Sequence, residues 1–462
     1  METSKKIYLV VGAISLSLVS CSFNQPVRPV PVEITAIEDS YSPETAVSLS
    51  EGPNLDEYIL YALRNSSGLR AAYNLYQAAK EKAPQASALP EPKLSYGYFI
   101  NSIETRVGPM QHRVGLAQPI PWFGKLSLKE EIADAEAKAA YYSFLTRKNK
   151  LVSDVVKAFY ELAYLQEAKT ITETNLELLK RWERVLASRY RSQTGTQADL
   201  IKVQVELGKL EDKLKELYDF HVPLQAHLNS LLNRPVNSKT VVKNVLDTSL
   251  DEAANTFLST SKESLNEMLE NQNPELKLLA ALAEARVKGI NLAKKDFYPD
   301  FSVGADYTFI GDRELAGSES GDDGLAAMFS ITIPINFSKY RAGLRESEYR
   351  NEAAKESLIS RKFQLSSILA RNMFDISDSK RRINLFKNTL VPKAEESLES
   401  TYTAFEAGEA SFLDLLDTER ELLDFQLMLS RAQADLVIHA SALRSLVGDY
   451  SEINTKFKGE SK

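Results

Sequence analysis

The 462-residue sequence contains a single cysteine, Cys21, and only four histidines. One cysteine excludes an intramolecular disulfide framework and any metal site built from several thiolates. Basic residues are also in deficit: 56 Lys and Arg face 63 Asp and Glu, which gives a formal net charge of -7. Because nucleic-acid binding relies on a basic surface, this charge argues against a nucleic-acid partner.

Catalytic motifs are missing as well. The sequence has no HExxH, P-loop or GxSxG motif. His221 and His227 have the wrong spacing for a helical pair of metal ligands, and His112 and His439 stand alone. The acidic residues are numerous but scattered, so no two of them stand out as an acid–base pair. The sequence therefore predicts no enzyme, no cofactor and no resident metal.

Long hydrophobic runs are absent except near the N-terminus. The apolar run from Ile7 to Val19 follows two lysines and is too short to span a bilayer as a helix. It ends in Leu-Val-Ser-Cys21, which resembles the lipobox of bacterial lipoproteins, and a thiol is nucleophilic enough to accept the lipid. We expect residues 1–20 to be a signal peptide and Cys21 to carry lipid, palmitate included. A plain secretory signal with an incidental cysteine is the alternative.

Residues 21–50 contain four prolines and few large apolar residues, so they are expected to form an extended tether. Ser22 directly after the cysteine is compatible with sorting to the outer membrane of a Gram-negative cell. No later run approaches eighteen apolar residues, so no transmembrane helix is expected. An exported chain of this kind is periplasmic, lipid-anchored or part of a β-barrel.

The chain repeats itself, which bears on the whole fold. Three pairs of similar segments occur in the same order: 92–95 with 299–302, 119–121 with 332–334, and 190–207 with 405–422. They indicate a duplicated unit of helix, strand hairpin and long helices, in which the first helix is expected at Leu55–Lys82 and at Leu276–Lys295. The expected organisation is a first repeat at 51–228 (strands about 93–120, coiled-coil helices about 125–228), an inter-repeat equatorial segment at 229–270, a second repeat at 271–445 (strands about 300–335, helices about 340–445) and a C-terminal tail at 446–462.

Each expected strand alternates apolar and polar or small residues, as in the run from Phe301 to Phe309 and the run from Leu325 to Ile333. Strands of about ten residues suit a tilted membrane crossing, although a half-buried hairpin in a soluble sandwich has the same period. Four strands cannot close a barrel, so several chains would have to contribute if these strands face lipid.

The expected helices are long. No proline or glycine interrupts the 68 residues from Lys125 to Ser192, which corresponds to about 100 Å of helix. Apolar residues recur at spacings of three and four, for example Val152, Val155 and Phe159, which is typical of a coiled-coil seam. Taken alone, the helices would also suit a soluble helical bundle.

Three segments together resemble the outer membrane factor family, the TolC-type outer membrane efflux proteins. They are Gln118–Lys125 (QPIPWFGK), Ile333–Asn336 with Lys339–Gly343, and Phe405–Asp417 with its partner Tyr190–Leu200. The resemblance implies a mainly α fold with a β-barrel contribution. Three chains would give four strands each to a 12-stranded membrane barrel, continued by a helical tunnel into the periplasm.

The resemblance also implies a function and partners. The chain would be the outer-membrane channel of a tripartite efflux system, a lipid-anchored homotrimer that passively conducts small molecules or ions. Its partners would be outer-membrane lipid, a periplasmic adaptor (membrane fusion protein) and an inner-membrane efflux pump. The alternatives are the exit duct of a type I protein secretion system and a non-conducting coiled-coil structural lipoprotein.

Carboxylates near the end of the second repeat are the expected periplasmic gate. Asp414 and Asp417 are three residues apart, hence on one helix face, and the resemblance places them in carboxylate rings at the closed end of the tunnel. Asp199 is the match in the first repeat, where Lys202 replaces the second acid. Phe405 stands where some members have a gate tyrosine. Two solvated surface acids are the alternative.

Two glycines, Gly195 and Gly408, are expected at the helix tips with positive φ. Their neighbours are the expected contacts of the adaptor, with turn formation as the competing role: Thr196, Gln197, Glu409, Ala410 and Ser411. Trp122 and Phe123 suit an anchor at the membrane interface, or alternatively packing at a hinge.

Overall fold

The protein is represented by a computed structural model that describes residues 49–242, 246, 251–313 and 321–448. Cys21, the expected signal peptide and almost all of the expected tether lie outside the described residues, as does most of the expected C-terminal tail.

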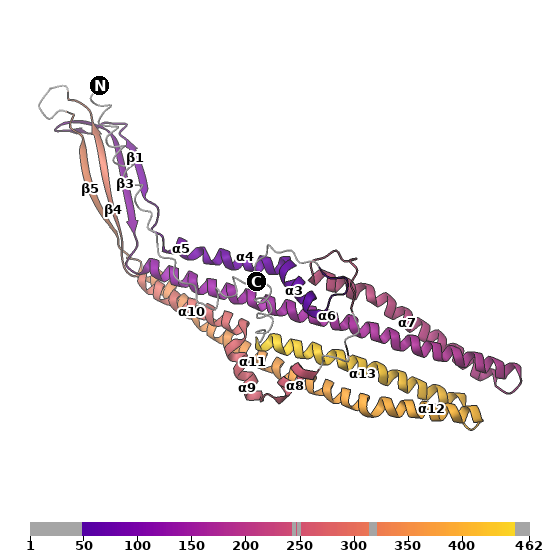
Figure 1. The fold of residues 1–462 in the computed structure, drawn as a ribbon. Helices are drawn as coiled ribbons and strands as arrows, with labels where there is room; N and C mark the ends of the chain where they lie inside the picture. Colours follow the sequence, from indigo (N-terminus) through magenta and orange to yellow (C-terminus); the bar gives the residue numbers. More distant parts are fainter. Residues whose placement is uncertain (1–48, 243–245, 247–250, 314–320, 449–462) are drawn as a thin grey trace. The chain divides into compact units, whose positions relative to one another are not determined.

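Helices make up most of the described chain, and the strands form one sheet (Figure 1). The first repeat contains α3 Leu55–Asn65, α4 Ser67–Lys80, α5 Lys82–Ser87, β1 Lys93–Tyr98, β2 Glu104–Thr105, β3 Gly108–Ile120, α6 Lys125–Arg191 and α7 Gln197–Leu231. The remainder contains α8 Asp251–Ser259, α9 Lys262–Gln272, α10 Pro274–Lys295, β4 Asp300–Ile310, β5 Gly324–Thr332, α11 Phe337–Leu385, the π-helix η1 Phe386–Leu390, α12 Val391–Ala407 and α13 Phe412–Val447.

Several expected boundaries differ from the observed elements. The single helix expected from Leu55 to Lys82 is broken after Asn65, because Ser66 takes an extended backbone and its side chain accepts a hydrogen bond from the amide of Leu69, which starts α4. The second repeat, expected from residue 271, has its first helix boundary at Asn273, the N-cap of α10, and α13 continues two residues beyond 445.

The sheet is antiparallel in the order β1-β3-β4-β5, with β2 paired to β3. Strand β3 of the first repeat pairs directly with β4 of the second, so the two hairpins form one surface. Strands β1 and β5 are the edges.

The register separates two faces of different chemistry. One face carries mainly apolar and aromatic residues, with one glutamine: Leu94, Tyr96, Tyr98, His112, Val114, Leu116, Gln118, Ile120, Phe301, Val303, Ala305, Tyr307, Phe309, Leu325, Ala327, Phe329 and Ile331. The other carries small or polar residues and one methionine: Ser95, Gly97, Arg113, Gly115, Ala117, Ser302, Gly304, Asp306, Thr308, Gly324, Ala326, Met328 and Ser330. The apolar face is open to solvent: Leu94 is 74% and Phe329 67% exposed. No second sheet covers it among the described residues.

Helix α6 is the longest element and packs against α4, α5, α7, α10 and α13. Its 67 residues correspond to about 100 Å of helix. The expected seam is buried: Val152, Val155 and Phe159 are each 2% exposed or less. No helix in the described ranges is both long enough and apolar enough to cross a membrane.

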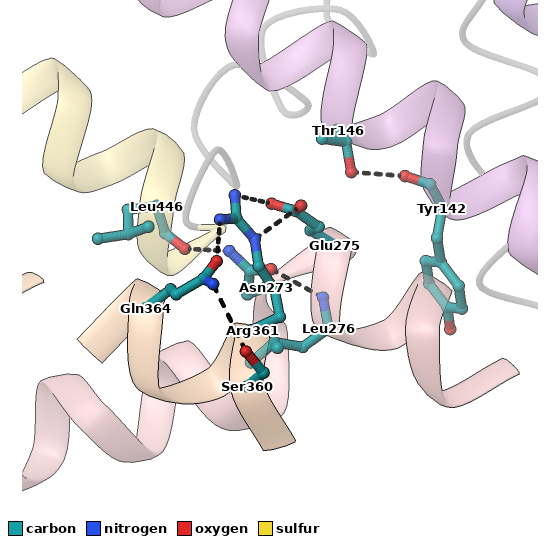
Figure 2. Close-up of polar contacts among 9 residues, drawn as sticks. All are labelled: Tyr142, Thr146, Asn273, Glu275, Leu276, Ser360, Arg361, Gln364 and Leu446. Carbon is teal, nitrogen blue, oxygen red and sulfur yellow. Dashed lines mark hydrogen bonds and ion pairs between the residues drawn. The ribbon is translucent and has the colours of Figure 1, made fainter. Parts of the chain in front are cut away.

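The inter-repeat helices and the second repeat are tied together by a polar anchor (Figure 2). Asn273 accepts a hydrogen bond from the amide of Leu276 (2.9 Å) at the start of α10 and donates to the carbonyl of Leu446 (2.7 Å) near the end of α13. Arg361 of α11 forms two bonds of 2.8 Å to the Glu275 carboxylate. Under this anchor lies an apolar cluster that includes Leu265, Leu269, Leu369, Ile376 and Leu443.

Candidate functional site at the hairpin tips

The α6–α7 and α12–α13 connections are two turns with different backbone conformations. In the second turn Gly408 has φ +79°, as predicted, and the amides of Glu409 and Ala410 donate to the Ala404 carbonyl (2.8 and 3.2 Å). In the first turn Gln193, with φ +62°, takes the left-handed conformation, so the prediction of a positive φ at Gly195 is wrong.

Gly195 has another reason to be glycine. A Cβ on it would lie 2.9 Å from the Cβ of Arg189, closer than carbon atoms tolerate. The close approach brings the amides of Thr194 and Gly195 onto the Arg189 carbonyl (2.9 and 3.1 Å), which accepts the last hydrogen bonds of α6. The turn therefore needs glycine for space.

Both helices that leave the turns begin with a side-chain cap. The Thr196 hydroxyl accepts from the amide of Asp199 (3.1 Å) and donates to its carboxylate (2.6 Å). Ser411 and Asp414 form a reciprocal capping box, with Asp414 accepting from the Ser411 amide (3.0 Å) and hydroxyl (2.7 Å). These two bonds lower the pKa of the Asp414 carboxyl. Asp199 and Asp414 thus occupy equivalent positions and fix the start of their helices.

The residues three positions further on carry opposite charges. Asp417 is paired with Arg420 on its own helix (3.1 Å), and its side chain is 59% exposed. Lys202 lies 3.6 Å from Asp199. The second tip thus carries two carboxylates where the first carries one carboxylate and one ammonium.

Two cationic side chains join the first helical hairpin, α6–α7, to the second helical hairpin, α12–α13. The Arg189 guanidinium of α6 lies over the ring of Phe405 on α12 (4.5 Å to the centroid), and its Nη1 donates to the Phe405 carbonyl (3.4 Å). Arg420 of α13 is ion-paired with Glu206 of α7, and this hydrogen bond lowers the pKa of Glu206. The expected gate residue Phe405 is therefore buried at a contact between the two repeats.

Under these links lies an apolar core, here called the tip cluster, to which both hairpins contribute. Trp182 of α6 packs edge-on to Phe412 of α13, which also contacts Phe405 (ring centroids 6.3 and 5.9 Å). Its buried members are Leu176, Leu179, Trp182, Leu186, Val203, Leu207, Leu210, Phe405, Phe412, Leu415 and Leu416. Their burial holds the two tips together in one chain.

A buried carboxylate lies one helical turn beyond the tip cluster. Glu419 of α13 is 1% exposed, and no hydrogen-bond partner is present for its Oε1 atom among the described residues. Burial is the largest cause that raises the pKa of Glu419, to about 7; Glu206 and Asp424 raise it further and Arg420 opposes them.

The strand–helix junction lies before α6. Trp122 stacks on Tyr298 (centroids 5.1 Å apart, planes at 18°), and its amide donates to Asp300 (2.7 Å). The buried Lys125 donates to the same Asp300 oxygen (2.9 Å). Phe123, in contrast, is 73% exposed. Trp122 is thus packed at the junction between the sheet and the helices, whereas the ring of Phe123 contacts Trp122 and is otherwise mostly exposed. The role of both residues at a membrane interface stays a prediction.

The sequence pointed to the capping residues Thr196 and Ser411 only as adaptor or turn residues, and to the acids only as a gate. Four further residues at the tips were not predicted: Arg189, Glu206, Glu419 and Arg420. One signal was available: Glu419 interrupts an apolar seam between Leu416 and Leu422. Arg189, Glu206 and Arg420 make contacts between segments that lie more than two hundred residues apart in the sequence, and no spacing rule predicts such contacts.

The sheet with one apolar and one polar face, followed by long paired helices, defines the class of helical outer-membrane channel proteins. The chain matches the family model for outer membrane efflux proteins over residues 59–217 and 265–449, and it belongs to that family.

Among its relatives are the cobalt-zinc-cadmium resistance protein CzcC of Cupriavidus metallidurans and the outer membrane protein TolC of Vibrio cholerae. CzcC is 22% identical, over 82% of this chain and 83% of CzcC; TolC is 24% identical, over 86% of this chain and 91% of TolC. The outer-membrane channel OprN superposes with a TM-score of 0.70 at 18% identity, covering 89% of this chain and 95% of OprN. VceC of Vibrio cholerae also reaches 0.70, at 19% identity over 85% of this chain and 96% of VceC. The mainly helical fold with a small sheet is thus that of the outer membrane factors.

Proposed function

We propose that this protein is the outer-membrane channel component of a tripartite efflux system. It passively conducts small molecules or ions that an inner-membrane pump delivers through a periplasmic adaptor. The observation that carries the proposal is the four-stranded surface with an exposed apolar face and a polar opposite face. A surface of this kind is stable when lipid covers the first face and water the second.

The unpaired edges of the sheet support a trimer. Within the ranges that the structure describes, the outer edges of β1 and β5 have no strand partner, and lipid offers their backbone groups none. Three copies joined edge to edge give twelve strands, enough to close a barrel with a polar interior. The helices that follow then form a tunnel wall. Lipidation of Cys21, which lies outside the described residues, would anchor each chain to the outer membrane.

The tips of the hairpins are the proposed gate and adaptor contact. Threefold symmetry would gather Asp414 and Asp417 from each chain around the axis, as rings that attract cations. Opening would require α12 and α13 to move relative to α6 and α7, which breaks the Arg420–Glu206 and Arg189–Phe405 contacts. The turn residues named above, from Gly195 to Gln197 and from Gly408 to Ser411, are mostly exposed and are the proposed surface for the adaptor.

Cargo is proposed only at the level of small molecules or ions. The names of the relatives extend from cobalt-zinc-cadmium resistance to pyoverdine export, and the identity to each is below 25%.

Single-channel recording in planar bilayers tests this function. We expect the detergent-extracted protein to conduct and to be blocked by divalent cations. In D414N/D417N, which removes both charges and keeps a polar group at the cap, half-block should need about tenfold more divalent cation or more, because the ring charge is lost. The matched control is E395Q/E399Q, two exposed acids on α12, with block unchanged.

Two results would contradict the proposal in different ways. Unchanged block in the double variant rejects the gate assignment. A stable oligomer that never conducts rejects the channel and favours a structural lipoprotein, whereas a conductance that polypeptide alone occludes favours a protein secretion duct.

A further inference from the structure

Glu419 has a place in the fold that an apolar residue would fill. It lies on the buried side of α13, three and four residues after Leu416 and Leu415 and three before Leu422, all of which are buried. The burial is complete within one chain, so it does not depend on how copies associate. A carboxylate in such a seam loses its hydration and is costly when ionised.

The groups around Glu419 do not neutralise it. Glu206 on α7 and Arg420 and Asp424 on α13 are the charged groups that act on its carboxyl among the described residues. The only cation of the three, Arg420, directs its two terminal nitrogens at Glu206 and Asp417. Oε1 of Glu419 has no hydrogen-bond partner among the described residues. The protonated, uncharged form is therefore the one that suits the closed seam.

We propose that Glu419 is a proton-sensitive switch of the tip: when protonated it stays buried between the hairpins, and when it loses its proton it favours separation of α13 from the first hairpin. This inference rests on the proposed function, because it assigns a regulation to the same gate.

The direction of the pH effect follows from linkage. In the closed tip the pKa of Glu419 is about 7, and in an opened, hydrated tip it returns towards the ordinary glutamate value of 4.5. Between these two values the closed tip holds a proton that the open tip has released. Raising the pH through this window therefore favours opening, by up to about tenfold per pH unit in each chain. Above the upper value the dependence levels off.

The experiment uses two independent readouts on the full-length protein. Spin labels on Q197C and E409C report the separation of the two tips, and bilayer recording reports the open probability, both between pH 5 and pH 8. With native Glu419 we expect longer label distances and at least about a tenfold rise in open probability as the pH rises. In E419Q, which keeps the shape and cannot ionise, both readouts should be independent of pH. The control E421Q removes an exposed acid from the same helix and should behave like the native protein.

A second variant keeps the test decisive if E419Q folds poorly. E419L restores the apolar seam and should hold the tip closed at every pH. A native-like pH response in either variant overturns the proposal. A tip that moves with pH through Glu419 in a protein that carries no current leaves the switch intact and rejects the channel. If divalent block depends on Asp414 and Asp417 but the pH response is the same with and without Glu419, the channel proposal stands and the switch is rejected.

Discussion

The two repeats reach their tips by different routes. Helix α6 runs through 67 residues to the first turn without a break, whereas the second repeat passes from α11 through the π-helix η1 into α12. Between the strand end and the tip the second repeat is two residues longer than the first. This follows from the sequence offset between matching positions, which is 213 at residues 119 and 332 and 215 at residues 190 and 405. A π-turn holds one more residue than an α-turn, so η1 absorbs one extra residue without rotating the helix that follows.

The two repeats thus differ in the length of the helix that leads to the tip but agree in the side on which that helix carries its buried apolar residues. Pro392, the second residue after η1, lacks an amide hydrogen, and a π-turn is a place where such a missing bond is tolerated. Both hairpins consequently present apolar residues to one tip cluster although their helices differ in length.

The largest expected difference between the two repeats is their response to the deletion of one residue. Removal of the exposed Asn388 should convert η1 to α-helix and leave the register of α12 unchanged. Removal of the exposed Lys150 should rotate the rest of α6 by about 100° and turn the seam residues after it out of the core. We expect the Asn388 deletion to yield a stable folded protein by thermal melting and circular dichroism, and the Lys150 deletion to yield none. Equal stability of the two would disprove the role assigned to η1.

The turns give the next largest contrast. Gly408→Ala places a Cβ at φ +79° and should destabilise the second tip by about 1–2 kcal/mol. Gln193→Gly removes a side chain from a left-handed position and should stabilise the first tip, by about 1 kcal/mol or less. Hydrogen exchange of the amides in the two turns measures each effect locally. If the amide protection of the turns changed in the same direction in both variants, the left-handed positions assigned to Gly408 and Gln193 would be wrong.

The caps give the smallest contrast. Loss of either hydroxyl, in Thr196→Ala or Ser411→Ala, should cost about 1 kcal/mol at the start of its helix. The Ser411 variant should lose less, because the backbone amide of residue 411 still donates to Asp414 when the hydroxyl is gone, whereas both hydrogen bonds between Thr196 and Asp199 use the Thr196 hydroxyl. Conservative Thr196→Ser and Ser411→Thr serve as controls in the same exchange experiment. A larger loss of stability at Ser411 than at Thr196 would contradict this order.

Much of the fold was predictable because it depends on local patterns. The period-two runs placed the strand residues of β4 and β5 correctly on one face, although Ile333 falls just outside β5. The uninterrupted run after Lys125 predicted α6. The break at Ser66 was missed because its extended backbone and cap outweigh an unbroken helical pattern.

The candidate site was predictable only in part. The acids and turn glycines stand out in the sequence, but the roles of Asp199 and Asp414 in capping depend on where the helices begin. The contacts of Arg189 with Phe405 and of Arg420 with Glu206 join the two repeats, and no local pattern encodes them. The gate and adaptor assignments stay predictions.

The sequence by itself determined the duplication, the strand and helix periods and the family, because these depend on residue order and short-range sterics. Only the tertiary structure decided which charges meet at the tip and that Gln193 takes the left-handed position instead of Gly195. It also decided that Glu419 is buried with no partner for one carboxylate oxygen in the described part of the chain. Burial and charge pairing arise from the approach of distant segments, and a carboxylate acquires an unusual pKa only when that approach removes its water.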